Sequence, residues 1–136
     1  MSPGCEAYVM VVDDDPDLRE TITEVLQDNE YRVVGAANGQ EALDVLHSAP
    51  GRPCIILLDL MMPVMDGKTF RAAIMKEPEL RGIPIVILSA HANIDDLMAE
   101  LPVEAKLRKP VDIEPLLTLV DRHCKGAVAP ARADHA

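Results

Sequence analysis

The chain has 136 residues and a formal net charge of -10 at pH 7. This length fits one ordinary domain with its own buried core. The acidity argues against direct binding of nucleic acid, because a phosphate backbone requires clustered Lys and Arg. No apolar stretch reaches the length of a membrane span, so we expect a soluble, cytoplasmic protein with no membrane contact.

Apolar runs typical of strands alternate with helical patterns along the chain. In chain order, the predicted strands cover residues 8–12, 32–36, 54–58, 84–88 and 105–108. The predicted helices cover 16–29, 40–47, 67–76 and 93–100, and a fifth begins at 112. The first of them has the clearest signals, since Asp15 can cap it and Pro16 suits the first helical position.

Strict alternation, with strands that are apolar on both faces, predicts a parallel sheet covered by helices on both sides. The fold class is therefore α/β with five strand-helix repeats. We expect residues 7–125 to form the domain. Residues 1–6 are predicted to be a flexible N-terminus and 126–136 a disordered tail, because neither has an apolar period.

The three cysteines are odd in number, widely spaced and without a C-x-x-C motif: Cys5, Cys54 and Cys124. Cys54 opens an apolar run, where a small thiol would pack well. We therefore expect all three to be reduced structural cysteines.

Polar side chains stand at the carboxyl ends of four predicted strands. They are Asp13, Asp14 and Asp15 after the first strand, Asp59 after the third, Ser89 after the fourth and Lys109 after the fifth. In an open parallel sheet these ends share one edge, where such folds bind their ligands. The sequence therefore predicts one site, although Asp15 taken alone is better explained as a helix cap.

The chemistry of this set suits phosphoryl transfer. Close carboxylates repel one another unless a cation lies among them, and Mg²⁺ prefers oxygen ligands. Asp59 could then attack a phosphoryl group whose oxygens are held by the cation, by Lys109 and by a hydrogen bond from Ser89.

The motifs around these residues are 11–14 (VVDD), 57–67 (LLDLMMPVMDG), 85–90 (IVILSA) and Lys109-Pro110. Together they resemble the receiver domain of bacterial two-component response regulators, over about residues 8–125. The resemblance implies a five-stranded sheet of order 2-1-3-4-5 with five helices, a flavodoxin-like three-layer sandwich. It also implies that the Lys-Pro peptide is often cis.

By the same resemblance, Asp59 accepts a phosphoryl group from a sensor histidine kinase or a phosphotransfer protein. Asp14, Asp59 and the carbonyl of Met61 would bind Mg²⁺ directly, with Asp13 acting mainly through water. Ser89 and Lys109 would contact the phosphoryl group. The chain would act as a signalling switch on an unknown protein target, and as an enzyme only toward its own phosphorylation and dephosphorylation.

The sequence departs from the family at Lys106, where receivers usually have an aromatic residue whose rotamer reports activation. The usual coupling between that aromatic residue and Ser89 cannot operate here. A receiver that binds partners without being phosphorylated is therefore one alternative.

A phosphatase of the haloacid-dehalogenase type is the other alternative, because Asp13-Asp14-Asp15 contains an Asp-x-Asp motif after an apolar strand. Asp13 would then be the nucleophile and Asp15 the acid. This hypothesis leaves Asp59 unexplained and lacks a further acidic pair at a strand end.

Overall fold

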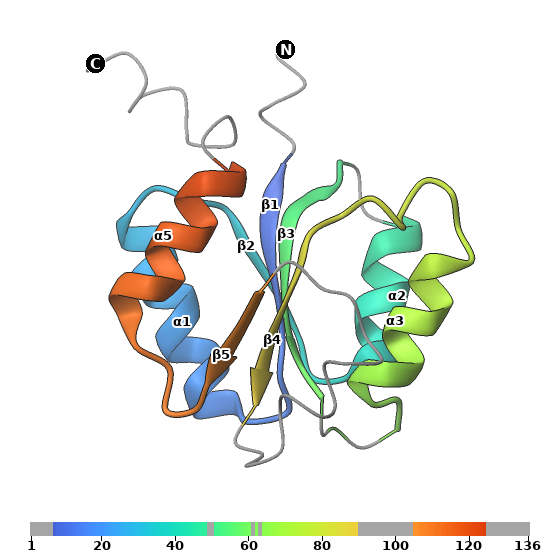
Figure 1. The fold of residues 1–136 in the computed structure, drawn as a ribbon, viewed down its shortest axis with the longest axis horizontal. Helices are drawn as coiled ribbons and strands as arrows, with labels where there is room; N and C mark the ends of the chain where they lie inside the picture. Colours follow the sequence, from blue (N-terminus) through green and yellow to red (C-terminus); the bar gives the residue numbers. More distant parts are fainter. Residues whose placement is uncertain (1–6, 49–50, 61, 63, 90–104, 125–136) are drawn as a thin grey trace.

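The computed structural model describes residues 7–48, 51–60, 62, 64–89 and 105–124. These residues form a parallel sheet with helices on both faces (Figure 1). The strands are β1 (Tyr8–Val12), β2 (Val33–Ala36), β3 (Pro53–Asp59), β4 (Ile85–Ser89) and β5 (Ala105–Arg108). The helices are α1 (Pro16–Asp28), α2 (Gly39–Ser48), α3 (Gly67–Met75) and α5 (Ile113–Cys124).

The predicted fold class is confirmed, and each predicted strand is present to within one residue at either end. The order is β2-β1-β3-β4-β5, as the resemblance implied, and every neighbouring pair is parallel. The helix predicted over 93–100 and the predicted flexible ends lie outside the described residues.

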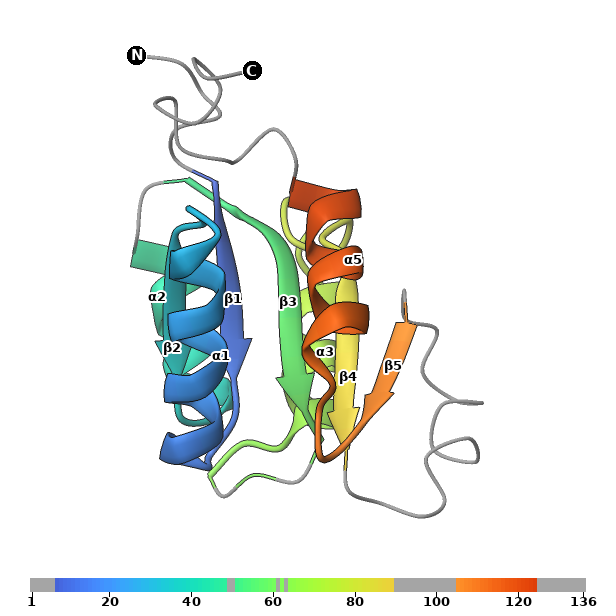
Figure 2. The same ribbon diagram turned by 90° about the vertical axis from the view of Figure 1, so that its left-hand side faces the viewer.

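In the described part of the chain, two helices cover each face of the sheet. Helices α1 and α5 lie on one face, toward the viewer in Figure 2, and α2 and α3 lie on the other (Figure 1). Alternate residues of the central strands point to opposite faces, so Val9 and Leu57 pack toward α1 and α5 while Met10 and Leu58 pack toward α2 and α3. This double coverage explains why these strands are apolar on both faces.

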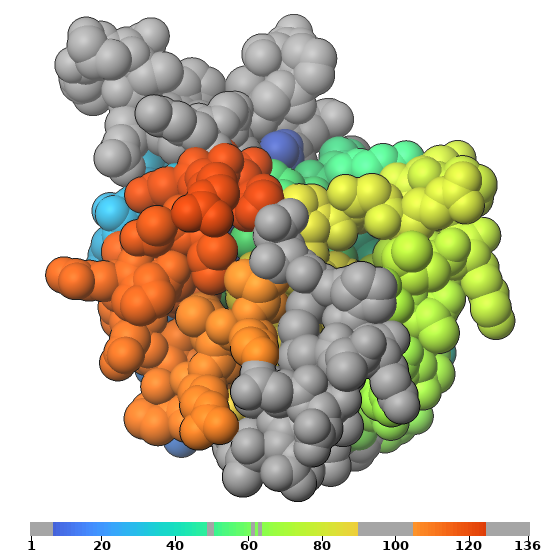
Figure 3. All heavy atoms as spheres, viewed as in Figure 1, coloured from blue at the N-terminus to red at the C-terminus, as the bar shows by residue number. Residues whose placement is uncertain are grey.

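The last strand is an edge strand, and its signal in the sequence is correspondingly weak. Ala105 and Leu107 are half-buried, whereas Lys106 and Arg108 are exposed. The space-filling view shows α5 and the segment around β5, in red and orange, at the surface on one side, with α3 in yellow-green on the other (Figure 3).

The helix caps follow the sequence signals. The Asp15 carboxylate accepts hydrogen bonds from the N–H groups of Asp17 and Leu18, with Pro16 in the first turn of α1. Asp66 caps α3 in the same way by accepting from the N–H of Thr69 at 2.8 Å. The predicted cap role of Asp15 is confirmed. Among the described residues, no helix combines the length and apolar character needed to cross a membrane.

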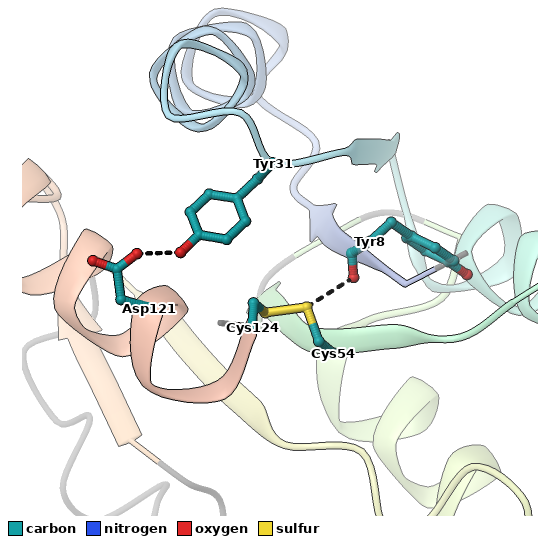
Figure 4. The surroundings of a disulfide bond; sticks show 5 residues. All are labelled: Tyr8, Tyr31, Cys54, Asp121 and Cys124. Atoms are coloured by element: carbon teal, nitrogen blue, oxygen red, sulfur yellow. Dashed lines mark hydrogen bonds between the residues drawn. A yellow bond between two sulfur atoms is a disulfide. The ribbon is translucent and has the colours of Figure 1, made fainter. Parts of the chain in front are cut away.

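The expectation of reduced cysteines was wrong for two of the three. Cys54, near the start of β3, and Cys124, the last residue of α5, form a disulfide with their Cα atoms 5.3 Å apart (Figure 4). They are separated by 70 positions in the sequence. Sequence spacing could not reveal the pair, because it depends on α5 running back along the sheet until its carboxyl end meets the amino end of β3.

Gly67 allows α3 to begin directly against the end of β3. Its N–H donates to the carbonyl of Leu60 at 3.0 Å. A Cβ atom at this position would lie 2.6 Å from the backbone oxygen of Asp59 and 2.8 Å from the Cα of Leu60, which is closer than atoms can pack. The absence of a side chain at Gly67 therefore sets the path of the loop that follows Asp59.

We expect Gly67→Ala to lower the free energy of unfolding by about 2 kcal/mol, because backbone atoms must move to admit the methyl group. Urea denaturation measures the change. Gly82→Ala is the matched control, since a Cβ there meets nothing within 4 Å, and its effect should stay within about 0.5 kcal/mol. Equal losses in the two variants would contradict this explanation.

Candidate functional site

Four charged side chains from three strand ends meet at the carboxyl edge of the sheet. Asp13 and Asp14 follow β1, Asp59 ends β3, and Lys109 follows β5. One carboxylate oxygen from each of the three aspartates lies within 4.8 Å of the others. The Nζ atom of Lys109 lies 2.9 Å from Oδ2 of Asp13 and 3.5 Å from Oδ2 of Asp59. The structure thus brings together four of the residues that the sequence singled out.

The members of this cluster differ in burial. Asp13 is fully buried and Asp59 is 4% exposed, whereas Asp14 is exposed. A buried carboxylate is unfavourable unless it has partners. Asp13 accepts a hydrogen bond from the N–H of Asp15 at 2.9 Å on Oδ1 and faces the Lys109 ammonium on Oδ2. Lys109 therefore compensates much of the negative charge that the fold buries here.

The charge of Lys109 is secured by its surroundings. Burial lowers the pKa of Lys109, but the hydrogen bond and charge of Asp13 and the charge of Asp59 outweigh it, so the pKa lies above its ordinary value. A raised folded-state pKa stabilises the fold fully below the ordinary pKa of lysine, and this stabilisation is lost as pH rises through the higher folded value. At neutral pH the Lys109 side chain therefore keeps its positive charge.

The backbone of Asp13 is held by two hydrogen bonds, one through its N–H and one through its carbonyl. Its N–H donates to the carbonyl of Ala36 on β2 at 3.1 Å, which continues the sheet by one residue. Its carbonyl accepts from Nη1 of Arg19 at 2.5 Å. The Arg19 stem crosses β2 over Gly35, where a Cβ would lie 3.2 Å from Cδ of Arg19. Sequence reasoning missed the role of Arg19, because an arginine in the second turn of a helix is ordinarily a solvated charge.

Ser89 and Lys109 are joined through the backbone. Ser89 ends β4 with 1% of its surface exposed, and its carbonyl accepts from the N–H of Lys109 at 2.9 Å. In the sheet register Asp59 pairs with Leu88, so Ser89 stands one position beyond Asp59 at the same edge. The Lys109-Pro110 peptide is cis. Met61, whose carbonyl was predicted to bind the cation, lies outside the described residues.

The donor set suits a hard divalent cation. Carboxylate oxygens are the ligands that Mg²⁺ and Mn²⁺ prefer, and three are available within one small volume. Because Asp14 is exposed, an ion could keep several waters on the solvent side, as Mg²⁺ requires. The residues present therefore fit the predicted Mg²⁺.

Residues 9–121 match the family model described as the response regulator receiver domain. The chain is 35% identical over 118 residues to an uncharacterised 14.6 kDa protein of Leptolyngbya boryana, covering 85% of this chain and 88% of that one. It is 37% identical over 117 residues to the transcriptional regulatory protein GlrR of Escherichia coli K12, covering 85% of this chain. The match spans only 26% of GlrR.

Solved structures agree with this assignment. A putative response regulator from Chloroflexus aurantiacus superposes with a TM-score of 0.77 at 28% identity, covering 88% of this chain and 98% of that one. The Mn²⁺-bound form of the response regulator Rcp1 superposes with a TM-score of 0.68 at 29% identity, covering 86% and 90%. The sheet order, the acidic cluster at its carboxyl edge and the family match together show that the chain belongs to the response regulator receiver domain family, the signalling module of two-component systems.

Proposed function

We propose that Asp59 is the phosphoryl acceptor of this receiver domain and that Mg²⁺, held by Asp13, Asp14 and Asp59, is required for the transfer. One observation chiefly supports the proposal. The Asp59 carboxylate stands at the end of a buried strand with two carboxylates beside it and the Lys109 ammonium 3.5 Å away. Such a nucleophile, placed between two sources of positive charge, is what phosphoryl transfer needs from a protein.

In the transfer, an oxygen of Asp59 attacks phosphorus in line with the donor, and the bond between phosphorus and the donor breaks with its electrons going to the donor. When bound, Mg²⁺ would neutralise charge on the phosphoryl oxygens. Lys109 would hold another of these oxygens through Nζ, and Ser89 would donate a hydrogen bond. The carbonyl of Met61 would complete the protein share of the metal ligands.

Phosphorylation would change the charges that Lys109 faces. In the structure one ammonium faces the two carboxylates of Asp13 and Asp59, and phosphorylation would replace the charge on Asp59 with a phosphoryl group carrying about -1.5 to -2 charges. We expect Lys109 to turn toward that group and leave Asp13 to the cation. Because the Lys109 N–H is bonded to the Ser89 carbonyl, such a movement would bear directly on the ends of β4 and β5.

The donor would be a phosphohistidine on a sensor histidine kinase or a phosphotransfer protein in the cytoplasm. The output would pass through a protein partner, since a net charge of -10 disfavours direct binding of nucleic acid. The chain would act on no substrate beyond its own phosphorylation and dephosphorylation. The Mn²⁺-bound form of Rcp1 supports the choice of a divalent cation for the site.

One alternative keeps some support. Lys106 occupies the place of the usual aromatic residue and is exposed on β5, which is compatible with a receiver that binds partners without phosphorylation. The haloacid-dehalogenase alternative has none, because it needs Asp15 as an acid and the Asp15 carboxylate caps α1 instead.

We expect the chain to gain the mass of one phosphoryl group when it is incubated with acetyl phosphate and Mg²⁺. Asp59→Asn should abolish the gain, because the amide is not a nucleophile toward phosphorus. Asp28→Asn, which removes an exposed carboxylate at the end of α1, should leave it intact. Intact-mass spectrometry measures all three chains. An unmodified parent chain would favour the phosphorylation-independent alternative.

We expect Asp14→Asn to weaken Mg²⁺ binding by about tenfold or more, because it removes a charged ligand from the acidic cluster. Asp15→Asn removes the same charge one residue away and keeps a good helix cap, so its affinity should change far less. Calorimetric titration with MgCl₂ compares the chains. Equal weakening in the two variants would indicate that only the overall charge attracts the ion.

A further inference from the structure

The Cys54–Cys124 disulfide lies at the opposite end of the sheet from the acidic cluster. It joins β3 to α5, two elements whose other ends lie near that cluster. Cys54 is near the start of β3, which ends in Asp59, and Cys124 ends α5, which begins shortly after Lys109. The Asp59–Lys109 ion pair at 3.5 Å joins the carboxyl end of β3 to the segment that leads into α5. The disulfide ties the carboxyl end of α5 itself to β3.

The last turn of α5 also has a polar contact with the turn that follows α1. The hydroxyl of Tyr31, in the turn between α1 and β2, donates to Oδ1 of Asp121 (Figure 4). The helix also packs on the sheet through apolar contacts of the fully buried Leu116 and Val120. Breaking the disulfide would remove the covalent link between this turn and β3, while leaving the core packing of the helix in place.

The surroundings of the bond suit both redox states. Cys54 is half-buried whereas Cys124 is 1% exposed, so Cys54 is the more accessible of the two cysteines to an external thiolate. The same sulfur lies 3.3 Å from the backbone carbonyl oxygen of Tyr8 (Figure 4). A disulfide sulfur has no proton to give to that oxygen, but a Cys54 thiol would find a hydrogen-bond acceptor already in position.

We propose that Cys54 and Cys124 form a reversible redox site, reduced by a dithiol, whose state sets how firmly the carboxyl end of α5 is held on the sheet. This proposal rests on the proposed function, because a chain phosphorylated by a cytoplasmic kinase is itself in the cytoplasm. Disulfides in that compartment are typically transient and redox-sensing rather than permanent staples. The two cysteines would then hold the carboxyl end of α5 on the sheet in the oxidised state and release it in the reduced state.

The reaction is a thiol-disulfide exchange in two steps. A thiolate of the dithiol attacks Sγ of Cys54, the S–S bond breaks, and Cys124 leaves as a thiolate that takes up a proton. The second thiol of the reductant then attacks the mixed disulfide and releases Cys54 as a thiol. The dithiol becomes a disulfide, and two electrons and two protons pass to the protein.

The experiment uses the full chain with Cys5→Ser, so that no third thiol can exchange. Oxidised and dithiothreitol-reduced samples are alkylated and weighed, and their amide hydrogen exchange is compared in peptides from α5 and from α3. The reduced sample should show two alkylated thiols and the oxidised sample none. Exchange in the last turns of α5 should rise by about tenfold or more on reduction, with α3 unchanged. The melting temperature should fall by roughly 10 °C, because the cross-link closes a long loop in the unfolded chain.

Reoxidation should restore the slow exchange in α5. The Cys54→Ser/Cys124→Ser variant of the same chain is the control, and its exchange should be fast and insensitive to dithiothreitol. Three results would overturn the proposal: no disulfide in the oxidised chain, no reduction of the folded chain by excess dithiothreitol, or unchanged exchange in α5 on reduction. Repeating the test with Asp59→Asn separates the two proposals, because that chain cannot be phosphorylated at Asp59 and should keep the full redox response.

Discussion

The structure depends on compensating the negative charge that β1 and β3 carry into the protein at Asp13 and Asp59. Both carboxylates are buried, and Lys109 is the cation in the described part of the chain that reaches both. The sheet order makes this reach informative. Lys109 follows β5, which is an edge strand, and Asp13 follows β1. Although β4 and β3 lie between these two strands in the sheet, the Lys109 ammonium comes within 2.9 Å of Asp13. The ends of β1, β3 and β5 must therefore be correctly placed for Lys109 to reach both carboxylates.

This arrangement gives a physical reason for a switch. The Lys109 ammonium is shared between Asp13 and Asp59, so its position is sensitive to any change of charge on Asp59. The backbone N–H of Lys109 donates to the carbonyl of Ser89 at the end of β4. Helix α5 begins four residues after Lys109, at Ile113. A rearrangement of Lys109 would thus start at the point where α5 is attached, while the disulfide restrains the far end of the same helix.

Much of this could be predicted from the sequence, because the deciding signals are local. Apolar runs fixed the strands, Asp15 and Pro16 fixed the start of α1, and the polar residues after the strands marked the edge that carries the site. The resemblance supplied the strand order. Where local signals are weak, as in β5 with its exposed Lys106 and Arg108, the prediction depended on the repeat of strand and helix.

The features that the sequence did not reveal all depend on tertiary geometry. The pairing of Cys54 with Cys124 requires knowing which element ends coincide, and neither composition nor spacing contains that information. The contact of Arg19 with the Asp13 carbonyl depends on the path of the Arg19 side chain over Gly35. The closer approach of Lys109 to Asp13 than to Asp59 could not be predicted either, because β1 lies farther from β5 in the sheet order than β3 does.

The most direct test is a crystal structure of the chain with Mg²⁺ and beryllofluoride, a mimic of the phosphoryl group. We expect the beryllofluoride on Asp59, the cation on Asp13, Asp14 and Asp59, and Nζ of Lys109 moved from Asp13 to a fluorine atom. Beryllofluoride absent from Asp59, or Lys109 still paired with Asp13 beside it, would contradict the proposed role of this ion pair.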